Sequence, residues 1–247
     1  AIIDDTDAYL IATLNLPRVL FETDGTRNTQ SGHVFLSKIG ERHNLKKHID
    51  LNLMVAGIVD RDELKRWIAT GDESLAAREL RAASYVAAAM LTGGDTTSEF
   101  SGLSPARCMA FYLEYVEFIG ALVKAVPNDD GLPLYEMDAA AHLRWWAVMA
   151  TLRPGSTQGA FPVAQPMKFK RKAPMTDRVR VLSREGYLDE LRDVIATDKR
   201  TDATGGNAWF NIPTEADLAE ERIRLDARLY QWGTVTKPDP SFANRTE

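Results

Sequence analysis

A cluster of cations between residues 153 and 184 is the part of this sequence best suited to chemistry. It holds eight arginines and lysines against one acidic residue, Asp177, in a chain of 247 residues whose formal net charge is -5. In an extended segment, alternate residues project to opposite sides, so lysines would line one side and an aromatic ring and an arginine the other. Such cations can neutralise phosphates while the ring stacks on a base. The predicted contacts with nucleic acid or another polyanion are Lys168, Phe169, Lys170, Arg171, Lys172, Arg178 and Arg180.

These cations also have a second interpretation. Residues 154–174 contain four prolines, which favour an extended conformation over a helix. An extended basic arm can also pair with an acidic patch on a neighbouring subunit, or it can be a solvated loop, and the sequence does not decide among these alternatives. Only the first two predict that the arm contacts a second molecule.

Two groups of residues are candidates for a metal site: the carboxylates Asp4, Asp5 and Asp7, for which a solvated chain start or a helix cap is the simpler interpretation, and the histidines and carboxylates near residue 48. His43 and His48 are five residues apart, which on a helix separates them by roughly 140 degrees and prevents both from reaching one ion. In an extended segment His48 and Asp50 share a face, and His33 could join them from elsewhere. Histidines on the surface of a basic segment are the simpler interpretation, and the single cysteine excludes a thiolate cluster. We therefore expect neither a metal nor a cofactor.

Motifs for nucleotide binding and nucleophilic catalysis are missing from the sequence. It has no Gly-x-x-x-x-Gly-Lys-Ser/Thr, no Gly-x-Gly-x-x-Gly after a strand and no Gly-x-Ser-x-Gly. His142 and Cys108 fall inside predicted helices, where a core or interface histidine and a small buried thiol are more common than a general base and a nucleophile. No catalytic residue is predicted, and the sequence leans away from an enzyme.

Two long helices between Ser104 and Arg153 are predicted to position the arm. Ser104 and Pro105 are typical of a helix start, and apolar residues then recur every three or four positions as far as Val126. Residues 127–131, Pro-Asn-Asp-Asp-Gly, should end this helix, and a second one should run from about Leu134 to Leu152. Because both are apolar on most sides, we expect a buried central helix pair.

Further helices are expected on both sides of this pair. Apolar periodicity predicts helices over 51–68, 73–91 and 187–195. The second of these is rich in alanine, which would allow a neighbouring helix to approach closely. Thr214 with Asp217 forms a capping box that starts a last helix. The charged outer face of this helix should consist of Glu221, Arg222, Arg224, Asp226 and Arg228. Residues 9–21 fit either a short helix or an extended segment, and the polar stretch that follows fits a β-hairpin or a projecting arm.

The predicted fold is therefore mainly α, a multi-helix single domain around the central pair, with extended N-terminal and proline-rich basic arms. Its segments are an N-terminal arm or hairpin (1–49), a helical core (50–153), the basic arm (154–174), and C-terminal helices with a tail (175–247). No apolar run is long enough to span a bilayer, and the first residues lack the features of a secretion signal. We therefore expect no membrane partner. Because a single cysteine fits a reducing compartment, we expect a location in the cytoplasm or in a virion assembled there.

Extended arms on a helical body are typical of subunits that assemble with copies of themselves, an analogy at the level of fold. The leading hypothesis is a structural, homo-oligomeric protein, of the capsid or nucleocapsid type in a virion or nucleoprotein complex, which binds nucleic acid through the basic arm. The alternatives are a helical enzyme with an unrecognised active site and an adaptor module that binds a protein partner.

Overall fold

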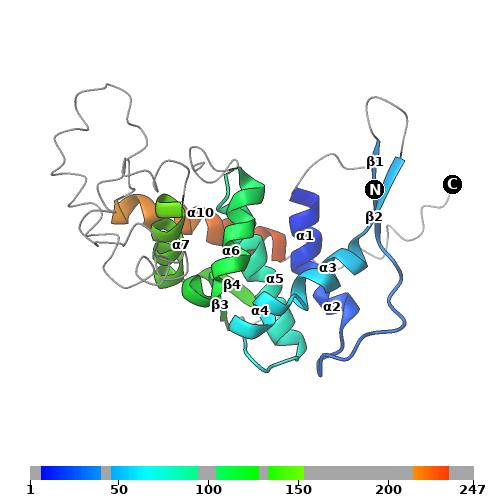
Figure 1. The fold of residues 1–247 in the computed structure, drawn as a ribbon. Helices are drawn as coiled ribbons and strands as arrows, with labels where there is room; N and C mark the ends of the chain where they lie inside the picture. Colours follow the sequence, from blue (N-terminus) through cyan, green and yellow to red (C-terminus); the bar gives the residue numbers. More distant parts are fainter. Residues whose placement is uncertain (1–6, 40–45, 94–103, 128–132, 153–213, 234–247) are drawn as a thin grey trace, which may run out of the picture.

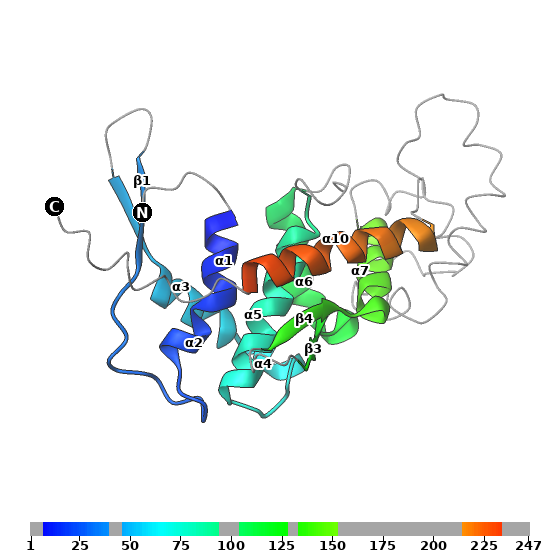
Figure 2. The same cartoon turned by 180° about the vertical axis from the view of Figure 1, so that it is seen from behind.

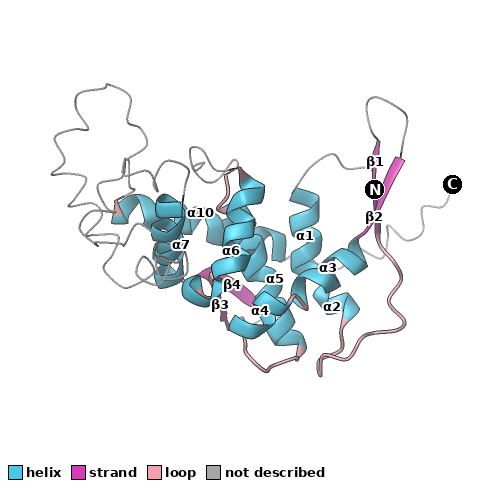
Figure 3. Ribbon diagram, viewed as in Figure 1, coloured by secondary structure: helices cyan, strands magenta, loops and turns pink. Residues whose placement is uncertain are grey.

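The computed structural model describes residues 7–39, 46–93, 104–127, 133–152 and 214–233. Within these residues the fold is mainly α, as predicted, with helices and two small two-stranded antiparallel sheets (Figure 3). The basic arm at 154–174 and the helix expected at 187–195 lie outside the described residues.

Helix α5 (Leu75–Met90) is the element around which the others pack. It contacts α1, α2, α3, α6 and α10 as well as the strands β3 and β4 (Figure 1). The Ser74 hydroxyl begins the helix by accepting a hydrogen bond from the backbone N–H of Ala77. Four fully buried alanines then let neighbouring backbones come close, as the alanine-rich pattern predicted. They are Ala82, Ala83, Ala87 and Ala88.

Residues 7–20 form two short helices, α1 (Asp7–Asn15) and α2 (Pro17–Leu20), which decides the alternative left open between a helix and an extended segment. Pro17 fits at the first helical position of α2, where its missing N–H costs nothing. Both helices lie against α5, and Leu20 and Phe21 join a small core with α3.

The N-terminal hairpin consists of β1 (Phe35–Ile39) and β2 (Lys46–Asp50), paired from Phe35 opposite Asp50 to Ile39 opposite Lys46. It stands at one side of the helical body, whereas α7 and α10 reach the opposite side (Figure 1). Asp50 ends β2 and caps α3 (Leu51–Val59), since its carboxylate accepts from the N–H groups of Asn52 and Leu53. Helix α4 (Asp62–Trp67) follows and packs on α6.

The predicted helix pair is present, but each helix is shorter than predicted, and α5 rather than this pair is the helix around which the others pack. Helix α6 (Pro105–Ile119) ends before Gly120, whose φ of 85° is in the left-handed region that glycine accepts most easily. Residues predicted as helix on either side of the connector form a hairpin instead, β3 (Val123–Val126) with β4 (Leu134–Met137). The Asp138 carboxylate then accepts from the N–H of Ala141, so α7 (Ala139–Leu152) begins after β4.

The pair packs as a unit in the core. The rings of Tyr112 in α6 and Trp145 in α7 lie 5.7 Å apart between centroids, and both side chains are fully buried. The Arg144 guanidinium donates to the carbonyl of Ile119, which would otherwise be an unpaired group at the end of α6.

The last described helix, α10 (Glu215–Gly233), lies across the body from α7 toward α1 (Figure 2). Its predicted capping box is confirmed: the Asp217 carboxylate accepts from the N–H and hydroxyl of Thr214, whose hydroxyl accepts from the N–H of Asp217. One apolar stripe of α10 is buried against β4, α5 and α1. The residues of this stripe are Leu218, Leu225, Leu229 and Trp232.

Candidate functional site

The predicted polyanion contacts all lie outside the described residues: Lys168, Phe169, Lys170, Arg171, Lys172, Arg178 and Arg180. The structure describes the helix that precedes these residues in the chain and the helix that follows them. Helix α7 ends at Leu152 and α10 begins at Glu215. The contact between these two helices is therefore the part of this region whose chemistry can be described.

A buried polar cluster joins α7 to α10. The Glu221 carboxylate on α10 accepts two hydrogen bonds at the same oxygen, from Nε2 of His142 and from Nε1 of Trp146, each at 3.0 Å. His142 is fully buried and Glu221 is 5% exposed. Removing a carboxylate from water is costly unless its oxygens are hydrogen-bonded, and both donors on α7 serve that purpose. The cluster is thus a specific polar contact inside an apolar interface.

An imidazole paired with a carboxylate is also the arrangement that activates a general base. A carboxylate can only accept, so the Nε2 atom of His142 carries a hydrogen, and this assignment rests on the hydrogen-bond pattern. The other ring nitrogen, Nδ1, has no hydrogen-bond partner among the described residues, and neither has Nε1 of the adjacent Trp145. Because His142 is fully buried, it fits the core role predicted for it. We interpret this cluster, called the α7–α10 clamp below, as structural.

Sequence reasoning placed Glu221 on the charged outer face of the last helix, and this was wrong. Glu221 follows Leu218 by three residues and precedes Leu225 by four, so it belongs to the stripe that faces the core. That spacing was visible in the sequence. A carboxylate inside an apolar stripe signals a buried partner, because an unpaired one would not remain there.

A second carboxylate of α10 also bonds inward. Asp226 accepts from the backbone N–H of Met137 at 2.6 Å and so ties α10 to β4. Burial raises the pKa of the Asp226 carboxyl, against the opposing effect of this hydrogen bond. Asp226 was likewise expected on the outer face, and it is half-buried.

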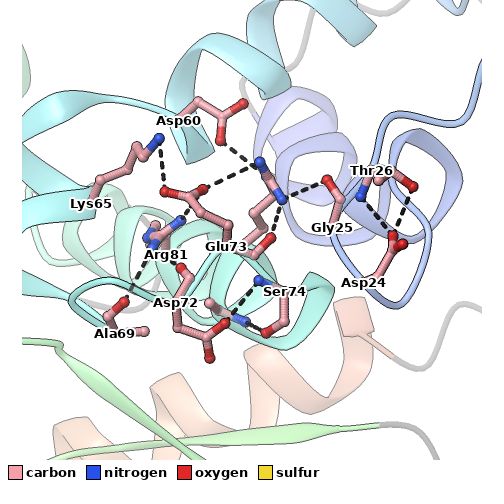
Figure 4. Close-up of polar contacts among 12 residues, drawn as sticks. Asp24, Gly25, Thr26, Asp60, Lys65, Ala69, Asp72, Glu73, Ser74 and Arg81 are labelled. Atoms are coloured by element: carbon pink, nitrogen blue, oxygen red, sulfur yellow. Dashed lines mark hydrogen bonds and ion pairs between the residues drawn. The ribbon is translucent and has the colours of Figure 1, made fainter.

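Two arginines on α5 form the densest cluster of charges in the described structure (Figure 4). The Arg78 guanidinium bonds the carboxylate of Asp60 at 3.0 Å and the carbonyls of Gly25 and Glu73, and lies over the Phe21 ring. Arginines gathered in this way can bind phosphate. Here the donors of Arg78 are directed at the protein's own oxygens.

Arg81 is fully buried and holds the turn that precedes α5. Its guanidinium donates to the carbonyls of Ile68, Ala69 and Asp72. The Glu73 carboxylate lies 3.6 Å from its Nη1 atom and 2.8 Å from the ammonium of Lys65. The hydrogen bond from Lys65 is the main cause that lowers the pKa of Glu73. This charge is compensated within the turn, so we interpret the Arg78–Arg81 cluster as structural rather than as an anion site.

The histidines considered for a metal site are only partly brought together. His33 Nδ1 lies 2.9 Å from the Asp50 carboxylate, and its ring stacks on Phe35. His48 is exposed and lies opposite Ser37 in the hairpin, and His43 is outside the described residues. In the described ranges, no three His, Cys, Asp or Glu side chains are arranged to hold a metal ion.

Cys108 lies in the core on α6, as expected of a small buried thiol. Burial raises the pKa of this thiol to about 11, so almost none of it is thiolate near neutral pH. Among the helices that the structure describes, none is long and apolar enough to cross a membrane.

Exposed apolar side chains gather where the hairpin meets α3. Val34 is 42% exposed, Phe35 51% and Leu53 61%. The chain segments that carry them are neighbours in the fold, because the N–H of Leu51 donates to the carbonyl of Val34 and the N–H of Val34 donates to the side-chain oxygen of Asn52. We call these three residues the hairpin patch. Apolar groups exposed together are more informative than single ones, because they often mark an interaction surface.

Comparison with protein-family models, curated proteins and solved structures found no match to this chain.

Proposed function

We propose that this chain is a structural, self-assembling subunit of a virion or nucleoprotein complex, and that it contacts nucleic acid through its basic segment. The proposed contacts are Lys168, Phe169, Lys170, Arg171, Lys172, Arg178 and Arg180. Such a subunit would act in the cytoplasm, or inside a particle assembled there.

The observation that carries the proposal is the separation of charge along the chain. Residues 153–184 hold eight cations and one anion, a net charge of +7, so the other residues must carry -12 for the total to be -5. An acidic body repels phosphate, whereas a concentrated basic segment releases counterions when it binds a nucleic acid. Charge separated in this way suits a subunit whose contact with a polyanion is confined to one segment.

Two features of the described structure support the proposal. The α7–α10 clamp holds α7, whose last residue directly precedes the basic segment, against α10, so the segment begins at a helix that is fixed in the body. The hairpin patch exposes apolar groups on the opposite side of the body, where a neighbouring subunit can cover them.

Binding to a single-stranded RNA oligonucleotide, followed by fluorescence anisotropy over a range of salt concentrations, tests the nucleic-acid contact. The test variant replaces Lys168, Lys170, Arg171 and Lys172 with serine. Each phosphate contact on a single strand contributes about 0.7 to the slope of log K against log salt, so loss of four contacts should reduce the slope by about 3.

A matched control removes four exposed cations of the body and makes the same change in net charge. It replaces Arg61, Arg66, Lys124 and Arg224 with serine. Their ion pairs are on the surface and contribute little to stability, so the control should fold. The control should keep the wild-type slope. Equal slopes in both variants would place the nucleic-acid contact elsewhere.

The oligomeric state tests the self-assembly separately. A chain that stays monomeric at every concentration, with and without RNA, would contradict self-assembly.

A further inference from the structure

The outer edge of strand β1 is a surface with unused hydrogen-bonding groups. The N–H of Leu51 donates to the carbonyl of Val34 at 2.9 Å, one position beyond the pair formed by Phe35 and Asp50. Hydrogen-bonded and non-hydrogen-bonded pairs alternate along an antiparallel ladder, so Leu36 and Lys38 direct their backbone groups toward β2. The backbone N–H and C=O groups of Phe35, Ser37 and Ile39 therefore point away from β2. No partner for these groups is found within the described part of the chain.

The two edges of this hairpin differ in how they resist pairing with another strand. Natural edge strands avoid such pairing with charged residues, lysine above all. Strand β2 has two successive lysines, Lys46 and Lys47, and its last residue, Asp50, is committed to capping α3. Strand β1 has a single lysine and begins with Phe35, which is 51% exposed and part of the hairpin patch. The edge of β1 is the less protected one.

The sequence of β1 fits a copy of itself. In an antiparallel pairing centred on Ser37, all five residues find a counterpart: Phe35 lies opposite Ile39 of the second copy, Leu36 opposite Lys38, and Ser37 opposite Ser37. This register agrees with the alternation above, since the three residues with outward backbone groups meet one another and form about six hydrogen bonds. It also places an aromatic residue across from a β-branched one, a favourable cross-strand pair.

We propose that the outer edge of β1 pairs with the same edge of a second copy of this chain, about a two-fold axis at Ser37. The result is a four-stranded sheet with the order β2-β1-β1-β2, which adds two strands to a hairpin that packs on α3 alone among the described helices with which it makes several contacts. The contact is isologous, because one patch serves both subunits. This inference rests on the self-assembly in the proposed function and names one of its interfaces.

The proposed contact is small. Five residues from each copy, with the hairpin patch beside them, form less than a standard interface of about 1,600 Å². We therefore expect a concentration-dependent equilibrium between monomer and dimer rather than a permanent dimer. Other surfaces are then needed for a larger assembly, and these lie beyond this proposal.

A proline at position 37 tests the pairing directly. The N–H of Ser37 points away from β2, so Ser37→Pro keeps the hydrogen bonds within the hairpin and removes two between the copies. Sedimentation velocity over a concentration series should show the association constant falling by about tenfold. The control Ser37→Thr keeps the N–H and suits a strand, so its association constant should stay within about twofold of wild type.

Two further measurements guard against a misfolded proline variant. Phe35→Lys should weaken association. The control Ile223→Lys, at a site on α10 that is 68% exposed, should not. Ser37→Cys should form a disulfide-linked dimer on mild oxidation, because opposed residues of a hydrogen-bonded pair have Cα atoms about 5.5 Å apart. The native Cys108 is buried and should not compete, and Gly57→Cys on the exposed side of α3 serves as the control.

The outcomes separate this inference from the proposed function. Weak association in the Ser37→Pro and Phe35→Lys variants, with cross-linking at position 37 alone, supports the β1 pairing. Wild-type association in both variants with no cross-link at position 37 overturns the pairing, yet leaves assembly through another surface intact. A wild-type chain that is monomeric at every concentration overturns the pairing and the proposed assembly together.

Discussion

Replacing Glu221 with alanine tests whether the α7–α10 clamp stabilises the fold. The substitution removes the acceptor of two hydrogen bonds and leaves the Nε2–H group of His142, which is fully buried, without this partner. A buried donor without an acceptor costs about 1–3 kcal/mol, and a hydrogen bond to a charged group contributes about 1.5–3 kcal/mol. Two donors lose this acceptor, and the loss is smaller for Trp146 because it is less buried than His142. We therefore expect the free energy of unfolding to fall by about 2–5 kcal/mol.

The neighbouring position on α10 provides the control. Glu220 is also a glutamate, but its side chain is 68% exposed and pairs with Arg224 one turn along the helix. Such surface pairs contribute about 0.3–0.5 kcal/mol, so Glu220→Ala should change stability by no more than that. The two variants lose the same atoms and the same charge from adjacent positions. Any difference between them therefore reports the environment of Glu221 alone.

Urea unfolding followed by tryptophan fluorescence measures both variants. With a slope of about 2–3 kcal/mol per molar urea for a chain of this size, a loss of 3 kcal/mol moves the midpoint down by roughly 1 M. Glu221→Gln keeps a side-chain oxygen that can accept, and should recover part of the loss. The double variant His142→Leu with Glu221→Leu should be more stable than the sum of its single variants predicts, since it leaves neither the imidazole N–H nor the carboxylate without the other, although Trp146 still loses this acceptor. If Glu221→Ala and Glu220→Ala unfold at the same midpoint, the clamp contributes nothing and our reasoning is wrong.

Three more predictions concern other described residues. Burial raises the pKa of Asp226 above its ordinary 3.8, so the folded chain holds this proton to a higher pH than the unfolded chain does. As the pH rises from the unfolded to the folded pKa of Asp226, the free energy of unfolding should therefore fall. Asp226→Asn, which keeps the accepting oxygen, should remove this fall in urea titrations across pH. Because Cys108 is buried and its pKa is raised to about 11, thiol reagents should label it only after unfolding, as mass spectrometry would show; rapid labelling of folded protein would contradict its burial. Gly25→Ala would strain a φ of +85° and overlap the carbonyl of Glu73, lowering the unfolding free energy by about 2 kcal/mol or more, whereas Gly32→Ala, with open space around it, should stay within about 0.5 kcal/mol.

Helix starts were the most predictable part of the fold. Ser104 and Thr214 were recognised as caps from their residue types, and the structure shows the corresponding side-chain hydrogen bonds. A cap depends on one side chain and the backbone three residues on, so the sequence contains the whole interaction. Helix α3 begins for the same reason where the apolar period begins, after Asp50.

The hairpin of β3 and β4 was missed because four-residue strands contain too little pattern. Leu134 and Met137 are three residues apart, which fits one face of a helix, whereas Tyr135 and Met137 are two residues apart, which fits one face of a strand equally well. The decision is made by Gly120, which ends α6, and by pairing with β3, from Val126 opposite Leu134 to Val123 opposite Met137. A cross-strand partner is tertiary information that the local pattern does not hold.

Part of the candidate site could be predicted from the sequence, and part of it needed the fold. The basic segment follows from composition alone, because charge can be counted without a fold. The partner of Glu221 is 79 residues away along the chain, so only the folded structure brings His142 to it. The presence of a buried partner was still deducible, since Glu221 interrupts the stripe that runs from Leu218 to Trp232.

The α7–α10 clamp specifies how α10 docks more than whether it docks. Each of the four apolar side chains that α10 buries contributes about 1.5–3 kcal/mol, so together they exceed the few kcal/mol of the clamp. Apolar contacts, however, tolerate sliding and rotation, whereas Glu221 meets both donors of α7 in one arrangement only. Glu221→Ala should therefore leave the helical content measured by circular dichroism unchanged while it lowers stability. If the clamp fixes the register of α10 on α7, it also fixes the two points between which the chain carrying residues 168–180 is held, and the same variant should weaken RNA binding without removing a cation.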